Sequence, residues 1–183
     1  MPLAPEYTAI LEVLAEACSL YRQKTGHDAV LVGGAATAIY TDGAFPSGDF
    51  DFVTADDAAF RKALRETGFR PERRAGHLLI GFYHPNHPQF GVQQVSGSLF
   101  EGRTDKHRMV HVVIRSPDAG LTLPPIEDLI ADRLAQHAVA SPSDTSRLLQ
   151  AQALFRLAHR LDKDYLQRRV HEEGGDLSLL MPP

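Results

Sequence analysis

Apolar residues recur along this chain with two periods, one typical of helices and one typical of strands. The helical period fills residues 6–24, and Gly26 then stops it. Short apolar runs between turn residues predict strands at 29–33, 49–54, 78–83, 90–95, 109–114 and 121–123. Further helices are predicted over 35–41, from Thr54 to about Gly68, from Pro125 to His137, from Ser143 or Asp144 to Leu161, and around 165–170.

This order of elements predicts an α/β (α+β) protein whose C-terminal part is helical. With 183 residues, of which 43% are hydrophobic, the chain can bury one good core. We expect that core to span residues 1–123 and a helical region at 124–175 to pack on it. Residues 176–183 are expected to form a flexible tail.

Two carboxylates stand close together on the strand predicted at 49–54. Because side chains alternate along a strand, Asp49 and Asp51 point to one face while Phe50 and Phe52 point into the core. Two adjacent carboxylates repel each other unless a cation lies between them. Mg²⁺ (or Mn²⁺) is the natural occupant, since it takes oxygen ligands and usually shares its shell with substrate phosphates. Taken alone, this Asp-x-Asp pattern could also mark a half-exposed strand without a function.

The segment before this strand suits a phosphate group. Gly33 and Gly34 follow the strand at 29–33, and glycine lets a backbone approach a phosphate closely. The short helix that comes next offers its N-terminus to an anion. Together with the two carboxylates, these features indicate metal-assisted chemistry on a nucleotide.

The same residues resemble the nucleotidyltransferase superfamily, whose fold is shared with the polymerase-β palm. The family pattern is a hydrophobic strand ending in Gly-Gly or Gly-Ser, a helix, and [Ser/Thr]-x-Asp-x-Asp on the next strand. Gly33 and Gly34 match the first part. Ser47, Asp49 and Asp51 match the second. The resemblance implies a mixed sheet flanked by helices, an NTP whose phosphates lie against the glycines and the serine, and a metal ion held by the aspartates.

Within the superfamily, the chain is most similar to small bacterial members related to type IV toxin–antitoxin and abortive-infection toxins. Residues 95–102 and 124–134 look like later segments of those proteins, and the resemblance covers most of residues 1–172. It raises an antitoxin protein as a partner. It also implies that a basic residue on the helix at 124–134 approaches the nucleotide, and Arg133 is that residue here. A structural ion pair, or exposure of Arg133 to solvent, is the alternative.

The chain departs from the family at one position. The family places a third carboxylate on a later strand, where it helps to bind metal and can accept the proton of the attacking hydroxyl. Aligning the strand at 90–95 with that pattern puts Gln93 at this position. An amide oxygen can coordinate a metal, but an amide has no charge and is no base at neutral pH. Glu101, a few residues further on, is the alternative third ligand.

Charge and composition exclude several other functions. The net charge of −4 argues against bulk, nonspecific nucleic-acid binding, although basic residues cluster at 61–74 and 103–108, as solvated faces or as surfaces for phosphate or RNA. His84 and His87 lack a third ligand nearby, so no zinc site is expected. No segment has the roughly 18 apolar residues of a membrane span. Because Cys18 cannot form an internal disulfide, we expect a cytoplasmic protein without a membrane partner.

We therefore expect an enzyme that moves a nucleoside monophosphate from an NTP to a hydroxyl acceptor. The acceptor could be an RNA end, a protein or a small molecule such as an aminoglycoside. The rival interpretation is a nucleotide-binding or regulatory protein that keeps the fold and has lost turnover, because Gln93 replaces the third carboxylate.

Overall fold

The structure is a computed structural model that describes residues 3–72, 81–96, 98–116 and 118–181. Its α-helices are α1 Pro5–Thr25, α2 Gly33–Tyr40, α3 Asp57–Glu66, α4 Ile126–Ala138, α5 Ser146–Leu157 and α6 Lys163–Glu173. Its strands are β1 Val30–Val32, β2 Asp49–Val53, β3 Arg70–Glu72, β4 Gly81–His84, β5 His87–Ser96, β6 Val110–Ser116 and β7 Ala119–Leu123. Three short 3₁₀ helices complete the described chain: η1 Leu99–Gly102, η2 Lys106–Arg108 and η3 Leu177–Leu180.

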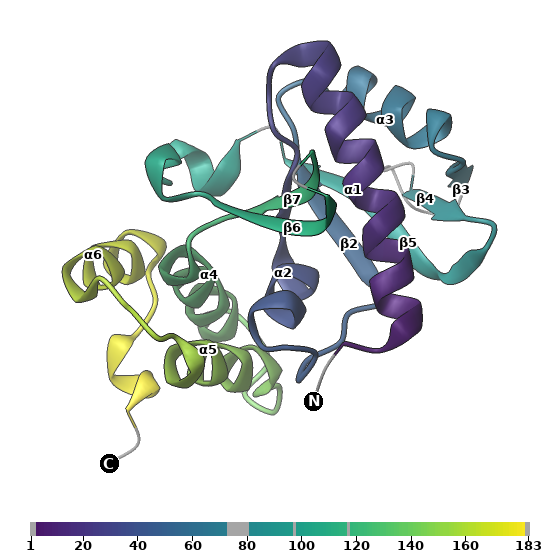
Figure 1. Cartoon of the computed structure of the whole chain (residues 1–183). Helices are drawn as coiled ribbons and strands as arrows, with labels where there is room; N and C mark the ends of the chain where they lie inside the picture. The colour runs from purple at the N-terminus through teal and green to yellow at the C-terminus, as the bar shows by residue number, and fades with distance from the viewer. Residues whose placement is uncertain (1–2, 73–80, 97, 117, 182–183) are drawn as a thin grey trace.

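All the described strands form one mixed sheet, in the order β3-β4-β5-β2-β1-β7-β6 (Figure 1). The central strand β2 runs antiparallel to β1 and parallel to β5, and β1 runs parallel to β7. The predicted α/β (α+β) fold, with a mixed sheet flanked by helices, is therefore confirmed. The order also brings β2 and β5 together, although about 40 residues separate their paired positions in the sequence.

One face of the sheet is covered by α1 and α3 (Figure 1). Phe50 and Phe52 point into this layer, and neither has any exposed surface. The stripe of apolar residues that predicted α1 packs against them, with Ile10 and Leu14 also fully buried. Since the side chains of β2 alternate, the opposite face of the strand carries Asp49 and Asp51, as the sequence predicts.

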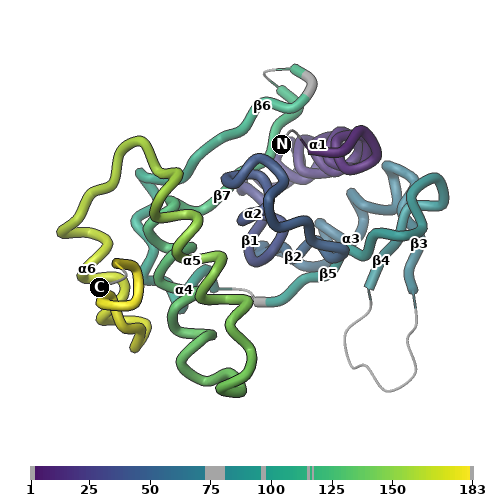
Figure 2. Tube along the Cα trace, turned by 90° about the horizontal axis from the view of Figure 1, so that it is seen from below, coloured from purple at the N-terminus to yellow at the C-terminus, as the bar shows by residue number. Residues whose placement is uncertain are grey.

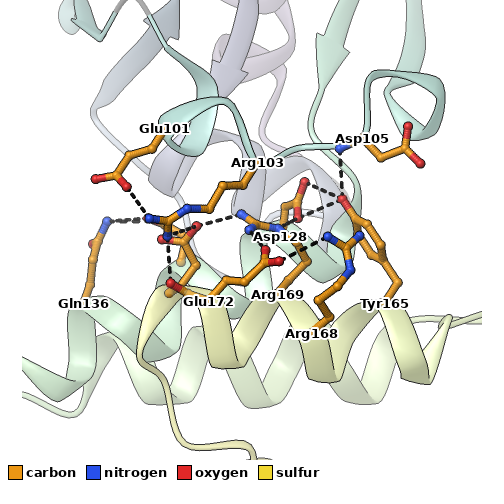
Figure 3. Close-up of polar contacts among 11 residues, drawn as sticks. Glu101, Arg103, Asp105, Asp128, Gln136, Tyr165, Arg168, Arg169 and Glu172 are labelled. Carbon is orange, nitrogen blue, oxygen red and sulfur yellow. Dashed lines mark hydrogen bonds and ion pairs between the residues drawn. The ribbon is translucent and has the colours of Figure 1, made fainter.

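The last three α-helices gather to one side of the sheet, beside α2 (Figures 1 and 2). A buried charge network joins α4 to α6 (Figure 3). Arg169 of α6 donates to Asp128 of α4 over 2.6 Å, and neither side chain has any exposed surface. Arg169 also pairs with Glu172 and Glu173 at 2.6 and 2.7 Å, and Tyr165 donates to Asp128 at 3.1 Å. Every charge in this cluster has an opposite charge beside it.

Several predicted helix ends differ from the structure, including the start of α5, which lies at Ser146 rather than at Ser143 or Asp144. Asp56, rather than Thr54, caps α3, because its carboxylate accepts from the backbone N–H of Ala59 at 2.9 Å. Thr54 instead donates its hydroxyl to Asp57 at 2.8 Å. Helix α5 ends at Leu157 and does not reach Leu161, because Ala158 has an extended backbone with ψ 116°.

Strand lengths and the C-terminal segment also differ from expectation. The predicted loop at 84–89 is shorter, since β5 already begins at His87. Part of the strand predicted at 78–83 lies outside the described residues, which resume at Gly81. Where the sequence predicts a flexible tail, residues 177–180 form η3, with Leu180 only 3% exposed. Gln152 of α5 fixes this turn by donating to the carbonyl of Leu179 at 2.8 Å.

Candidate active site

The pairing of β2 with β5 brings the three predicted site positions together. Asp49 lies opposite Gly91, and Asp51 lies opposite Gln93. Gln93 Nε2 donates to Asp51 Oδ1 over 2.7 Å, so the predicted position of this amide beside the carboxylate pair is confirmed. With its nitrogen used in this way, Gln93 keeps its carbonyl oxygen available as an acceptor or ligand.

A glycine lies directly against each of the two carboxylates. A Cβ atom at Gly33 would lie 2.8 Å from Asp51 Oδ2, and a Cβ atom at Gly91 would lie 2.5 Å from Asp49 Oδ1. Gly33 also has a φ of +69°, a backbone conformation that favours glycine. Gly91 was missed by the sequence analysis, because its importance depends on the partner strand rather than on its own neighbours in the chain.

Ser47 lies two residues before β2 and forms a hydrogen bond with the first residue of that strand. Its hydroxyl donates to the carbonyl of Asp49 at 2.9 Å. A Cβ atom at Gly34 would lie 3.0 Å from this hydroxyl, so Ser47 sits against the first turn of α2. The predicted phosphate-binding residues therefore share one corner of the site, next to the carboxylates and the N-terminus of a helix.

Asp51 is half-buried, and its environment disfavours the ionised carboxylate. Burial raises the pKa of Asp51, and the charge of Asp49 raises it further. The hydrogen bond from Gln93 and the positive charges of Arg133 and Arg147 act on this pKa in the opposite direction. Within the described ranges, no lysine or arginine forms an ion pair with Asp49 or Asp51. The described residues therefore place no positive charge in direct contact with the pair, although Arg133 and Arg147 act on Asp51 from further away.

The oxygen atoms of the site fit a hard divalent cation. Asp49 and Asp51 offer carboxylates on one face of β2, and Gln93 offers an amide oxygen beside them. Among residues 3–72, 81–96, 98–116 and 118–181, no group of three or more His, Cys, Asp or Glu side chains could hold a metal. Two carboxylates are sufficient for Mg²⁺, which usually completes its shell with water and substrate phosphates. The donor set therefore suits a metal that arrives with a phosphorylated substrate.

Two arginines from the C-terminal helices direct positive charge toward this site. Arg133 of α4 is only 3% exposed and pairs with its neighbour Asp132, so the structural ion pair that was the alternative for Arg133 is present. Its positive charge nevertheless lowers the pKa of Asp51. Arg147, in the first turn of α5, acts on Asp51 in the same way and was missed by the sequence analysis. One local signal could have identified it, because a cation in the first turn of a helix opposes the helix dipole.

The alternative third ligand and the basic runs have other partners. Glu101 on η1 accepts from Arg103 at 2.6 Å and faces the C-terminal helices (Figure 3). Arg108 pairs with Asp162 at 2.7 Å, which links the second basic run to α6. In the first run, Arg61 donates to Gln94 at 3.2 Å, whereas residues 73 and 74 lie outside the described residues.

Comparison with solved structures identifies the fold. An antigenic nucleotidyltransferase-like protein from Paracoccidioides brasiliensis matches 94% of this chain over 89% of its own, with a TM-score of 0.61 and 16% identity. The antibiotic-resistance factor ANT(2'')-Ia, in complex with adenylyl-2''-tobramycin, matches 93% of this chain over 98% of its own, with a TM-score of 0.58 and 10% identity. Its solution structure matches 90% of this chain over 91% of its own, with a TM-score of 0.57 and 8% identity. The chain therefore has the nucleotidyltransferase fold.

No protein-family model and no curated protein matches the chain. Among the helices of the described chain, none combines the length and the apolar character that crossing a membrane requires.

Proposed function

We propose that this protein is a Mg²⁺-dependent nucleotidyltransferase that moves a nucleoside monophosphate from an NTP to a hydroxyl group. One observation supports this most strongly: Asp49 and Asp51 share one face of β2, each lies against a glycine, and neither has a positively charged partner within the described chain. Two neighbouring like charges, one of them half-buried, cost folding free energy, which a bound cation and substrate would recover.

The surrounding residues have distinct roles in this proposal. Asp49 and Asp51 hold the metal ion, with the Gln93 amide oxygen as a further ligand. The backbone at Gly33 and Gly34, the N-terminus of α2 and the Ser47 hydroxyl bind the phosphates. Arg133 and Arg147, whose charges already act on Asp51, stabilise the negative charge of the triphosphate. When bound, the metal supplies positive charge to the phosphate oxygens at the reacting centre.

In the reaction, the acceptor hydroxyl oxygen forms a bond to the α-phosphorus of the NTP. The bond from that phosphorus to the oxygen bridging to the β-phosphorus breaks, and pyrophosphate leaves with the electron pair. The hydroxyl proton passes to water, because Gln93 offers no base at neutral pH. We expect chemistry slower than that of a site with a third carboxylate at this strand position.

One finer assignment rests on the sequence resemblance. A role as a toxin with an antitoxin partner stays a prediction. A cytoplasmic location is supported by Cys18, which is buried and free of any disulfide. The rival function, nucleotide binding without turnover, is separated from the enzyme by one assay. The protein is incubated with each labelled NTP, with Mg²⁺ or Mn²⁺, and with total RNA or cell lysate, and transfer of the label is measured. NTP binding without any transfer supports the rival function.

A further inference from the structure

A second feature lies on the same face of the sheet as the carboxylate pair. A cavity of about 460 Å³ opens between the strands and the segment 98–109. Its apolar wall comes from Val30 and Val53 on the sheet and from Leu99 and Met109 above them. Cavities of a few hundred Å³ with a mainly apolar wall and a few polar groups are typical of small-molecule sites.

Strand register connects this cavity to the candidate active site. In the antiparallel pair β1–β2, Val32 lies opposite Asp51, and Val30 lies opposite Val53. Side chains on one face of a strand recur every second residue, a spacing of about 7 Å. The Val30–Val53 pair in the cavity wall is therefore the next pair on the same face after Val32–Asp51. The described lining of the cavity stops one pair short of Asp51, so a molecule resting on these valines lies one register step, about 7 Å, from that carboxylate.

The cavity wall holds a polar atom without a partner. Thr104 Oγ1 is buried from solvent and has no hydrogen-bond partner among the described residues. A buried hydroxyl that lacks a hydrogen bond is uncommon in proteins, because it loses its bonds to water without replacement. Thr122, another threonine of the wall, shows the contrast, since its hydroxyl accepts from Arg22 at 3.3 Å. That oxygen is also closed to water, so it belongs to a tightly packed part of the wall and is not a contact for a bound molecule.

The charged groups of the wall do not suit a polycation. Among the described residues that line it, Asp28 is the only carboxylate, and it already pairs with Arg22. Lys106 also lines the cavity and makes no ion pair within the described chain. A ligand with several ammonium groups would therefore meet a positive charge and no free carboxylate.

The segment above the cavity is held in place by the C-terminal helices (Figure 3). Arg103 donates to the backbone carbonyl of Glu172 at 2.7 Å, and the Asp105 backbone N–H donates to the Tyr165 hydroxyl at 3.2 Å. These contacts fix the wall on both sides of Thr104. The cavity is thus built by the fold and does not depend on a ligand to shape it.

We propose that this cavity binds the acceptor, and that the acceptor is a small organic molecule with an apolar body, a hydroxyl group and no positive charge. This assignment rests on the proposed nucleotidyl transfer and selects among its acceptor classes. The apolar wall holds the body of the molecule, and the reacting hydroxyl lies toward Asp51. An RNA end or a protein side chain would leave the apolar wall unfilled.

Calorimetry without nucleotide or metal tests the cavity by itself. The probes are phenyl β-D-glucoside, which is neutral, phenyl β-D-glucuronide, which is anionic, and tobramycin, which is a polycation. Both phenyl glycosides should bind more tightly than tobramycin. Tobramycin binding more tightly than both, or no binding of either glycoside, would overturn the proposal.

Variants locate the binding. Met109→Trp fills the cavity and should abolish glycoside binding, whereas Val113→Trp, at an exposed position of β6 outside the wall, should not. Equal glycoside binding by the wild type and Met109→Trp would contradict this location.

Separate titrations with NTP and Mg²⁺ distinguish the two proposals. Glycoside binding together with NTP binding, followed by transfer of label to the glycoside hydroxyl, supports both. NTP binding without glycoside binding overturns the cavity assignment and leaves nucleotidyl transfer intact. Glycoside binding without any NTP binding overturns nucleotidyl transfer, and the acceptor role of the cavity with it.

Discussion

Asp51 on β2 is half-buried and Asp128 on α4 is fully buried, but within the described chain only Asp128 forms an ion pair. Asp128 is fully buried and receives hydrogen bonds from Arg169 and Tyr165. Asp51 is half-buried, lies beside Asp49, and receives one hydrogen bond from a neutral amide. A buried carboxylate that only supports the fold needs a partner within the protein. The absence of one at Asp51, within the described chain, is what separates this region from the C-terminal network.

The largest expected effect is the loss of activity when Asp49 or Asp51 is replaced. Asp49→Asn and Asp51→Asn should each abolish label transfer, because each removes a charged metal ligand. The same variants should leave the melting temperature unchanged or slightly higher in metal-free buffer, since repulsion within the pair is relieved. A large fall in melting temperature would show that these aspartates support the fold.

Gln93→Glu should increase activity by adding a base at the third position. General-base assistance typically contributes about 10²–10⁴-fold, so label transfer should rise well above the wild-type rate. Because the variant also loses the hydrogen bond to Asp51 and adds a third carboxylate, its melting temperature should fall in metal-free buffer and recover with Mg²⁺. An unchanged transfer rate would mean that proton removal does not limit this enzyme.

Asp128→Ala should destabilise the fold, because Asp128 is the carboxylate that forms a buried ion pair. It leaves the fully buried Arg169 without one of its partners, and breaking a buried ion pair costs about 3–5 kcal/mol. Denaturant unfolding should report a loss of this size, whereas Asp51→Asn should show none. If Asp128→Ala and Asp51→Asn change stability by similar amounts, the distinction between the two regions is wrong.

A smaller effect is expected at Arg147. Arg147→Gln should weaken NTP binding about tenfold, because one charged contact to the phosphates is worth roughly 1.5 kcal/mol. Arg156→Gln is the matched control, since Arg156 is exposed in the last turn of the same helix. Calorimetry on the two variants separates a specific phosphate contact from a general loss of positive charge, which would affect both equally.

The smallest effect is the pH dependence of stability. Because burial raises the pKa of Asp51 above the ordinary value of 3.8, the folded protein holds this proton more tightly than the unfolded chain does. The contribution of Asp51 to stability is therefore full below pH 3.8 and is lost as pH rises through the raised pKa. Asp51→Asn removes this loss, so the stability of the variant relative to the wild type should increase over that range in metal-free buffer. A constant difference would contradict the raised pKa.

Local patterns predicted the direction of the carboxylates but not their surroundings. The alternation along β2 is a property of consecutive residues, so the common face of Asp49 and Asp51 followed from the sequence. Gly91 acquires its importance from a contact across the fold, to which a single sequence gives no direct access. Arg147 left one indirect local signal, its positive charge in the first turn of a helix. The wall at 98–109 depends likewise on helix α6, more than 50 residues further along the chain.

Titration of the wild-type protein with ATP, GTP, CTP and UTP, with and without Mg²⁺, tests the central claim most directly. If the unmatched charge of Asp49 and Asp51 is a metal site, at least one NTP should bind only when Mg²⁺ is present, and Asp51→Asn should lose this binding while remaining folded. Binding that is the same without metal, or no binding of any NTP, would contradict the account.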